Sequence, residues 1–192
     1  MVLRERRYTL ADLREIEQRP ENSAKTFELI NGEVREVIAP EVIHNYIISM
    51  LVRKVGRYLD DNDIGLIFGD NMSYTLSNGD ELILDASFVT HAQITHPLPK
   101  RFHFAPDFAV EVSSPCNSER ELLEKAESYL QSGSKFVWIS YPIKRVFDVC
   151  HLTEDGSLLV HKVNINGTLD GEGVLPGFML AVKDVFPPTE SA

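Results

Sequence analysis

The sequence carries acidic side chains within two hydrophobic stretches, LILDASFVT around Asp85 and APDFAVEVSSP around Glu111. We predict strands over Leu82–Val89 and Pro106–Ser113, in which side chains alternate between the two faces, so that Glu111 points away from the core that the apolar residues face. If these strands form a hairpin symmetric about Leu98, Asp85 lies opposite Glu111, with Cβ atoms about 4.5–5.5 Å apart. Ionised carboxylates repel at that distance, and a divalent cation such as Mg²⁺, which binds through one or two carboxylates, would remove the repulsion.

A lysine and a further acid extend this candidate site. Hydrolysis at a metal needs positive charge near the developing oxyanion, and Lys125 lies on a helix predicted just after the Glu111 strand. The alternative for Lys125 is a solvated i, i+4 ion pair with Glu121. Glu28, on an earlier predicted strand, is either a third ligand or water-positioning residue, or an ordinary exposed strand residue.

Two further polar residues have both a chemical and a structural interpretation. Asp107 lies four strand positions before Glu111, which separates them by roughly 13 Å, too far to share one ion. Its alternative role is to accept a hydrogen bond from a neighbouring backbone amide at the strand entry. His44, near the start of a predicted helix, is a candidate proton carrier or substrate contact, and otherwise a structural histidine.

Other nucleophile and metal patterns are weak. Ser113 begins a Ser-Ser-Pro-Cys sequence, but no Gly-x-Ser-x-Gly elbow supports a serine nucleophile. His91, His96 and His103 share a proline-containing loop, and their spacing matches no zinc-ligand pattern.

Alternating strands and helices must position these residues. Helical periodicity predicts a helix over Thr9–Gln18 with Thr9 as its N-cap, a helix over Val42–Leu59, and a helix capped by Ser118 that stops at Gly133. The Asn31-Gly32 dipeptide predicts a two-residue hairpin turn. The strands that we predict besides the acid-bearing pair are Phe27–Ile30, Glu33–Ile38, Gly65–Phe68, Asn71–Leu76, KFVWIS, RVFDVCHL and SLLVHKVNI, and GEGVLPGFMLAVKDVF is expected to be a strand or turn followed by a short helix.

Length and composition restrict the class of protein. With 192 residues we expect one domain over 1–192, and no apolar run reaches the roughly 18 residues of a membrane helix. No apolar segment follows the basic N-terminus, so we expect no signal peptide, a cytoplasmic location, and reduced thiols at Cys116 and Cys150. The formal net charge of −10 disfavours nonspecific coating of DNA but not a metal-dependent nuclease, because a bound cation inverts the local charge.

Five segments, in order and spread over most of the chain, resemble the Uma-type restriction endonucleases of the PD-(D/E)XK nuclease superfamily. FELINGEVREV is similar to the family's Y-E-L-I-D-G-E, LDASFV to P-D-V-S-F-V, and APDFAVEVSSP to P-D-L-V-V-E-V-L-S-P. ELLEKAESYLQSGSKFVWIS is similar to D-x-x-x-K-x-x-x-Y-x-x-x-G-V-x-E-Y-W-L-V, and GEGVLPGFML to the family's tail. Departures are Leu84 for proline, Glu121 for aspartate, and Ser134-Lys135-Phe136 for V-x-E.

The resemblance implies an α/β (α+β) restriction-endonuclease-like core, a mixed central sheet flanked by helices. It implies that Asp85 and Glu111 bind Mg²⁺ or Mn²⁺, that Glu28 is the N-terminal acid, and that Lys125 is the catalytic lysine displaced onto the helix. Ser113 occupies the position at which an E-x-K motif would carry that lysine. The implied activity is metal-dependent hydrolysis of a DNA phosphodiester. A homodimer is expected as well, because cutting both strands of a duplex suits a two-fold arrangement.

Two other functions stay open. The net charge and the missing E-x-K lysine favour a catalytically inactive nuclease-fold module that binds nucleic acid or a protein partner. A metal-dependent enzyme that acts on a small phosphoester is the third interpretation.

Overall fold

The fold was analysed in a computed structural model that describes residues 7–37, 41–69, 72–115 and 117–188. The predicted strand ends at Ile38 and Asn71, and the thiol of Cys116, lie outside these residues. The α-helices are α1 (Leu10–Glu17), α2 (Val42–Asp61) and α3 (Glu119–Gln131), with 3₁₀ turns η1 (Pro20–Asn22), η2 (His91–Gln93) and η3 (Val182–Asp184). The strands are β1 (Phe27–Ile30), β2 (Glu33–Glu36), β3 (Gly65–Phe68), β4 (Met72–Thr75), β5 (Glu81–Leu84), β6 (Ala86–Thr90), β7 (Phe108–Val112), β8 (Phe136–Tyr141), β9 (Val146–Leu152), β10 (Leu158–Val163), β11 (Thr168–Asp170) and β12 (Met179–Ala181). None of the described helices is long and apolar enough to cross a membrane.

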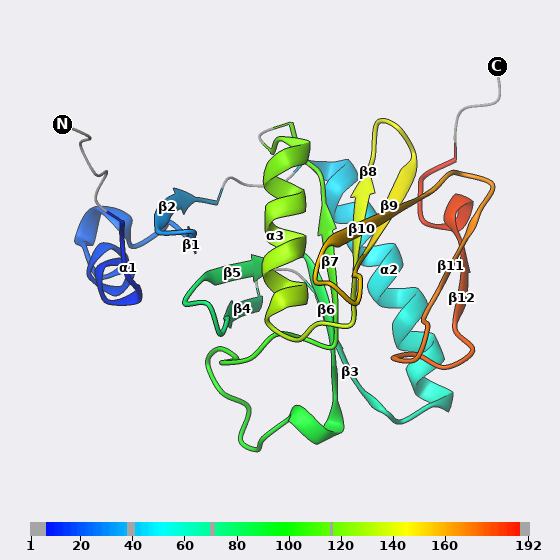
Figure 1. The fold of residues 1–192 in the computed structure, drawn as a ribbon, viewed down its shortest axis with the longest axis horizontal. Coiled ribbons are helices and arrows are strands. Elements are labelled where there is room, and N and C mark those ends of the chain that lie inside the picture. Colours follow the sequence, from blue (N-terminus) through cyan, green and yellow to red (C-terminus); the bar gives the residue numbers. More distant parts are fainter. Residues whose placement is uncertain (1–6, 38–40, 70–71, 116, 189–192) are drawn as a thin grey trace.

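A six-stranded mixed sheet in the order β10-β9-β8-β7-β6-β3 forms the centre of the structure (Figure 1). Its parallel pair is β7 with β8, and α3 makes the connection between them. Helix α3 covers one face of the sheet and α2 the other, each burying its apolar stripe against the strands (Figure 1). The prediction of a mixed central sheet flanked by helices is therefore confirmed.

A smaller sheet in the order β2-β1-β5-β4 lies beside the central sheet (Figure 1). The β1–β2 hairpin turns at Asn31-Gly32, where both residues have positive φ, 51° and 81°, as the predicted turn requires. Helix α1 packs on β1 through Leu13, which is fully buried against Phe27 and Leu29. The predicted caps are confirmed as well, since Thr9 begins α1 and Ser118 begins α3, each with a capping box.

The predicted continuous strand from Leu82 to Val89 is wrong in one respect. It divides at Asp85 into β5 and β6, which belong to different sheets. Asp85 is thus the single residue at which the chain passes from the small sheet into the central one. The physical reason is that β5 pairs with β1 and β4, whereas β6 pairs with β3 and β7.

Candidate active site

Glu111 projects from the central sheet toward α3. Along β7 the residues Phe108, Val110 and Val112 enter the core on the α2 side, and Ala109 enters the core on the α3 side. Glu111 follows Ala109 on that second face and is only 3% exposed. A carboxylate buried this deeply needs hydrogen-bond partners or an ion, because desolvation disfavours its charged form.

Asp85 lies next to Glu111 across the β6–β7 ladder. Ala86 pairs with Val110, and continuing this register by one residue places Asp85 opposite Glu111, the arrangement expected from a hairpin centred on Leu98. Strand β6 begins at Ala86, the partner of Val110, so it has no residue to pair with the part of β7 that follows Val110. The backbone amide of Val112 donates to Oδ2 of Asp85 at 2.6 Å instead of to a strand carbonyl.

His44 extends the site on the side of Asp85. It lies in the first turn of α2, and its Nε2 is 3.2 Å from Oδ2 of Asp85. The side chain of His44 is buried, whereas that of Asp85 is 16% exposed, so Asp85 is the member of the pair that is more accessible to solvent. The structure therefore places His44 beside a candidate ligand rather than in the core alone.

Lys125 links Glu111 to Glu28. Its Nζ lies 2.7 Å from Oε1 of Glu28 and 3.5 Å from Oε2 of Glu111, and all three side chains are buried. Oε1 of Glu28 also accepts the amide of Ile83 at 2.9 Å, which fixes β1 against β5. Burial alone would lower the pKa of Lys125, but the carboxylates of Glu111 and Glu28 outweigh burial and raise that pKa, so the ammonium stays charged.

The alternative for Lys125, a solvated pair with Glu121, is wrong. Glu121 instead accepts the backbone amide of Ser118 at 2.8 Å in the capping box of α3, and it pairs with Arg35 at 2.9 Å. The alternative for Glu28 is wrong too, because this strand residue is 7% exposed rather than exposed.

Tyr129 completes the arrangement, although its residue type and position in the sequence predicted no role for it. Its hydroxyl donates a hydrogen bond to Oε1 of Glu111 at 2.9 Å, and its ring is fully buried. Burial and the charge of Glu111 raise the pKa of Tyr129 well above its usual value, so the phenol keeps its proton and acts as the donor. The available signal was its spacing, since a residue four positions after Lys125 lies on the same helix face. We call Glu28, Asp85, Glu111, Lys125 and Tyr129 the Lys125 cluster.

The Lys125 cluster contains more acidic than basic side chains. Burial raises the pKa of Glu111 to about 8, an effect that Lys125 opposes and the carboxylates of Asp85 and Glu28 reinforce. When the three carboxylates and Lys125 are ionised and Tyr129 keeps its proton, three negative charges against one ammonium leave two negative charges of the cluster without a counterion. That excess equals the charge of one divalent cation.

The oxygen donors of the cluster fit Mg²⁺ or Mn²⁺. Mg²⁺ is a hard cation that binds through one or two carboxylates and keeps several waters. Asp85, directly before β6, and Glu111, on β7, can provide the two carboxylates. Within residues 7–37, 41–69, 72–115 and 117–188, no three or more His, Cys, Asp and Glu side chains are arranged to enclose a metal ion. A closed structural site with four such ligands is therefore not found among these described residues.

Asp107 and His91 have partners outside the cluster. Oδ2 of Asp107 accepts the amide of Thr90 at 2.8 Å and the side-chain amide of Gln93 at 2.7 Å, so Asp107 has the amide-capping role that was its structural alternative. His91 pairs with Asp63 at 2.6 Å on the surface. Ser113 follows β7 and donates its backbone amide to Ser140 O at 2.8 Å, in continuation of the parallel ladder.

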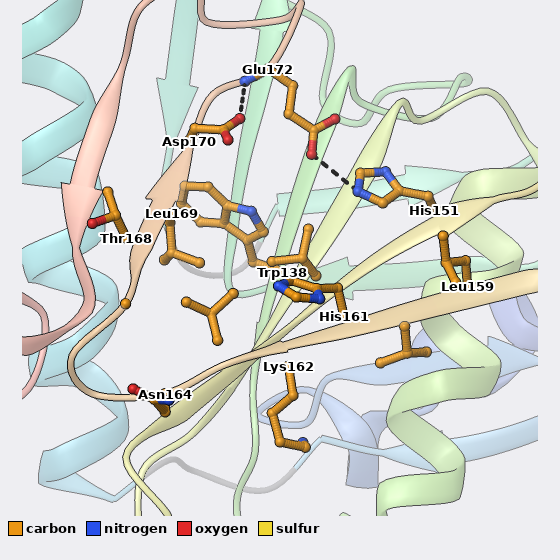
Figure 2. Close-up of a pocket in the computed structure, with 14 residues that line it drawn as sticks. Trp138, His151, Leu159, His161, Lys162, Asn164, Thr168, Leu169, Asp170 and Glu172 are labelled. Carbon is orange, nitrogen blue, oxygen red and sulfur yellow. Dashed lines mark hydrogen bonds and ion pairs between the residues drawn. The ribbon is translucent and has the colours of Figure 1, made fainter.

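A hollow of about 660 Å³ lies on the other side of the sheet, between β9, β10 and the segment that carries β11 (Figure 2). Trp138 lines it from the face that packs with α2, and His151 pairs across it with Glu172 at 3.0 Å (Figure 2). No carboxylate of the Lys125 cluster lines this hollow, so the candidate site and the hollow are separate features.

Comparison with known proteins places the chain in a family. Residues 11–183 match the Uma2 family, described as "Putative restriction endonuclease". The chain belongs to the Uma2 family. This confirms the resemblance drawn from the sequence motifs, and the matched segment contains every member of the Lys125 cluster.

A solved structure has the same fold as this Uma2 chain. It is the crystal structure of "a putative nuclease belonging to DUF820" from Anabaena variabilis, with a TM-score of 0.77 and 20% sequence identity. The similarity covers 91% of this chain and 96% of that one. No curated protein matches the chain.

Proposed function

We propose that this chain is a metal-dependent DNA endonuclease whose site is the Lys125 cluster. Membership of the Uma2 family and the nuclease-like fold support a nuclease. The observation that carries the finer proposal is the position of the Lys125 ammonium, within 3.5 Å of Glu111 on the strand next to Asp85. Two opposed carboxylates with a neighbouring cationic side chain are the parts that phosphodiester hydrolysis at a divalent ion requires.

Each residue has a distinct role in the proposed reaction. Asp85 and Glu111 hold Mg²⁺ or Mn²⁺, which when bound polarises the phosphate and lowers the pKa of a coordinated water. Lys125 keeps a positive charge beside Glu111, where negative charge grows on the phosphate oxygens during attack. Glu28 receives the nearer contact of Lys125 and so fixes the ammonium in place. His44, beside Asp85, is positioned to contact the substrate or to carry a proton at the solvent side of the site.

The test is cleavage of supercoiled, linear and branched DNA in the presence of Mg²⁺ or Mn²⁺, with an EDTA control. The wild-type chain, Glu111→Gln and Asp107→Asn should be compared at equal concentration. We expect metal-dependent nicking by the wild type and by Asp107→Asn, and a loss of at least about a hundredfold in Glu111→Gln, because that change removes the charge that holds the ion. Equal cleavage by all three proteins would refute the assignment of the site.

Two other outcomes would favour the other functions. A salt-sensitive gel shift with no cleavage would support a nuclease-fold module that binds nucleic acid, because the electrostatic part of DNA affinity falls with salt. Hydrolysis of a small phosphodiester without cleavage of DNA would support an enzyme that acts on a small phosphoester.

A further inference from the structure

The two candidate ligands share a geometric feature, in that each has one carboxylate oxygen already held by a donor of the protein. On Asp85 the held oxygen is Oδ2, which accepts the amide of Val112. On Glu111 it is Oε1, which accepts the hydroxyl of Tyr129. The remaining oxygen of Glu111, Oε2, lies 3.5 Å from Nζ of Lys125, a distance at the limit of hydrogen bonding.

Tyr129 holds one carboxylate oxygen of Glu111, just as the backbone amide of Val112 holds one carboxylate oxygen of Asp85. A buried phenol needs a hydrogen-bond partner. From its position on α3, the hydroxyl of Tyr129 donates to Oε1 of Glu111 at 2.9 Å. Both side chains are buried, at 0% and 3% exposure, so neither can exchange this contact for one with water. The bond therefore sets the rotation of the carboxylate about its last torsion angle.

We propose that Tyr129 is a positioning residue that holds Oε1 of Glu111 and so presents Oε2 as the oxygen that binds the metal ion. This inference rests on the proposed function, and it adds to that function the oxygen atom through which Glu111 acts. Residues that hydrogen-bond to metal ligands orient those ligands, and their loss weakens metal affinity although they never touch the ion.

The chain offers a matched control in Tyr74. Like Tyr129 it is fully buried in the core on the α3 side of the central sheet, and its hydroxyl makes one buried hydrogen bond, 2.7 Å to Oγ of Ser87. The variants Tyr129→Phe and Tyr74→Phe each delete one buried hydroxyl and keep the ring. They differ in whether the deleted hydroxyl touches a metal ligand.

The experiment is calorimetric titration of Mn²⁺ into the wild type and the two variants, with urea unfolding of the metal-free proteins alongside. We expect Tyr129→Phe to bind Mn²⁺ on the order of tenfold more weakly and Tyr74→Phe to bind like the wild type. The two variants should lose similar stability, so that a difference in affinity reports positioning rather than loosening of the core. Titration uses no DNA and needs no turnover.

The outcomes separate this inference from the proposed function. If both variants bind Mn²⁺ as tightly as the wild type does, Tyr129 is a packing residue and only the positioning role is overturned. If both variants lose affinity equally, the effect comes from the core, and the positioning role is again overturned. If the wild type itself binds no Mn²⁺, the metal-dependent function fails and the role of Tyr129 fails with it.

Discussion

Lys125 and Glu28 stand 97 positions apart in the sequence, and their charged atoms meet at 2.7 Å. The contact joins α3, which covers the central sheet, to β1 of the small sheet. Each side chain is 9% exposed, so water does little to screen the pair. Removing one partner of such a pair leaves an uncompensated buried charge, which costs more than the pair itself contributes.

Lys125→Met is expected to lower the free energy of unfolding by about 3–5 kcal/mol, because it leaves Glu28 and Glu111 buried without their cation. Urea unfolding of the metal-free protein measures this loss. The double variant Lys125→Met/Glu28→Gln should recover part of it, since one of the two stranded charges is gone.

The control for this prediction is Lys25→Met. The ammonium of Lys25 pairs with Glu36 at 2.8 Å, but both side chains are more than 40% exposed, so we expect a loss of less than about 1 kcal/mol. Similar losses at Lys25 and Lys125 would contradict the interpretation of Lys125 as a buried counterion.

Asp107→Ala is expected to reduce stability without changing metal affinity. The substitution leaves the amide of Thr90 without its acceptor, at a cost of about 1–3 kcal/mol. Mn²⁺ titration should give the wild-type affinity, in contrast to Glu111→Gln, which should lose it. A Mn²⁺ affinity that falls in Asp107→Ala at unchanged stability would return Asp107 to the group of ligands.

Glu81 gives the stability of the fold a dependence on pH. It is 2% exposed, and its carboxylate accepts Arg14 Nη1 at 2.8 Å and Arg101 Nη1 at 2.7 Å. Burial alone would raise the pKa of Glu81, but Arg14, with help from Arg101, outweighs burial and holds that pKa below its usual value. The folded state therefore binds the proton less readily than the unfolded chain. The contribution of the ionised Glu81 carboxylate to the free energy of unfolding is complete above its pKa in the unfolded chain, about 4.3. It is lost as the pH falls through the pKa of Glu81 in the folded state.

Urea unfolding between about pH 7 and pH 3 tests this dependence. We expect Glu81→Gln to be less stable than the wild type at neutral pH and the gap to narrow in acid, because the wild type then loses the same charge. Glu36→Gln, which removes an exposed carboxylate, should keep the wild-type slope. A gap that stays constant over the whole range would contradict the prediction.

Cys150 is expected to be an inert thiol in the folded protein. It is fully buried, and burial raises its pKa to about 12, so almost no thiolate forms near neutral pH. In a Cys116→Ser background, a thiol reagent at about pH 8 should react slowly with the native chain and completely after denaturation in guanidinium. Rapid reaction of the native chain would show that the strand β9 opens locally.

The local elements and one non-local register could be predicted from the sequence. Asn-Gly and the two capping boxes act over a few residues, so their turns and helix ends follow from local chemistry. The β6–β7 register followed from symmetry, since Ala86 and Val110 are equally distant from Leu98. That register is what sets Asp85 and Glu111 side by side. The extent of the domain, the cytoplasmic location and the homodimer stay predictions.

Features that depend on which strands pair could not be predicted. Leu82–Val89 contains no Gly or Pro, and its division at Asp85 follows only from the partners that β5 and β6 find in two sheets. The burial of Glu28 has the same origin, because an acid on β1 becomes buried only when β5 and α3 close over it. The short strand β11, paired with β12, was missed because three residues carry too little periodicity.

The place of Glu28 on the small sheet has a consequence for any shortened form of this chain. A fragment that starts after β2 would retain all six strands of the central sheet, the helix α3 and both opposed carboxylates. It would lack the acid that now holds Lys125 at 2.7 Å, and the ammonium would be drawn onto Glu111, its remaining partner. In the proposed nuclease the lysine would then compete with the cation for Oε2 of Glu111, so the N-terminal hairpin would serve to keep Lys125 away from the metal-binding oxygen.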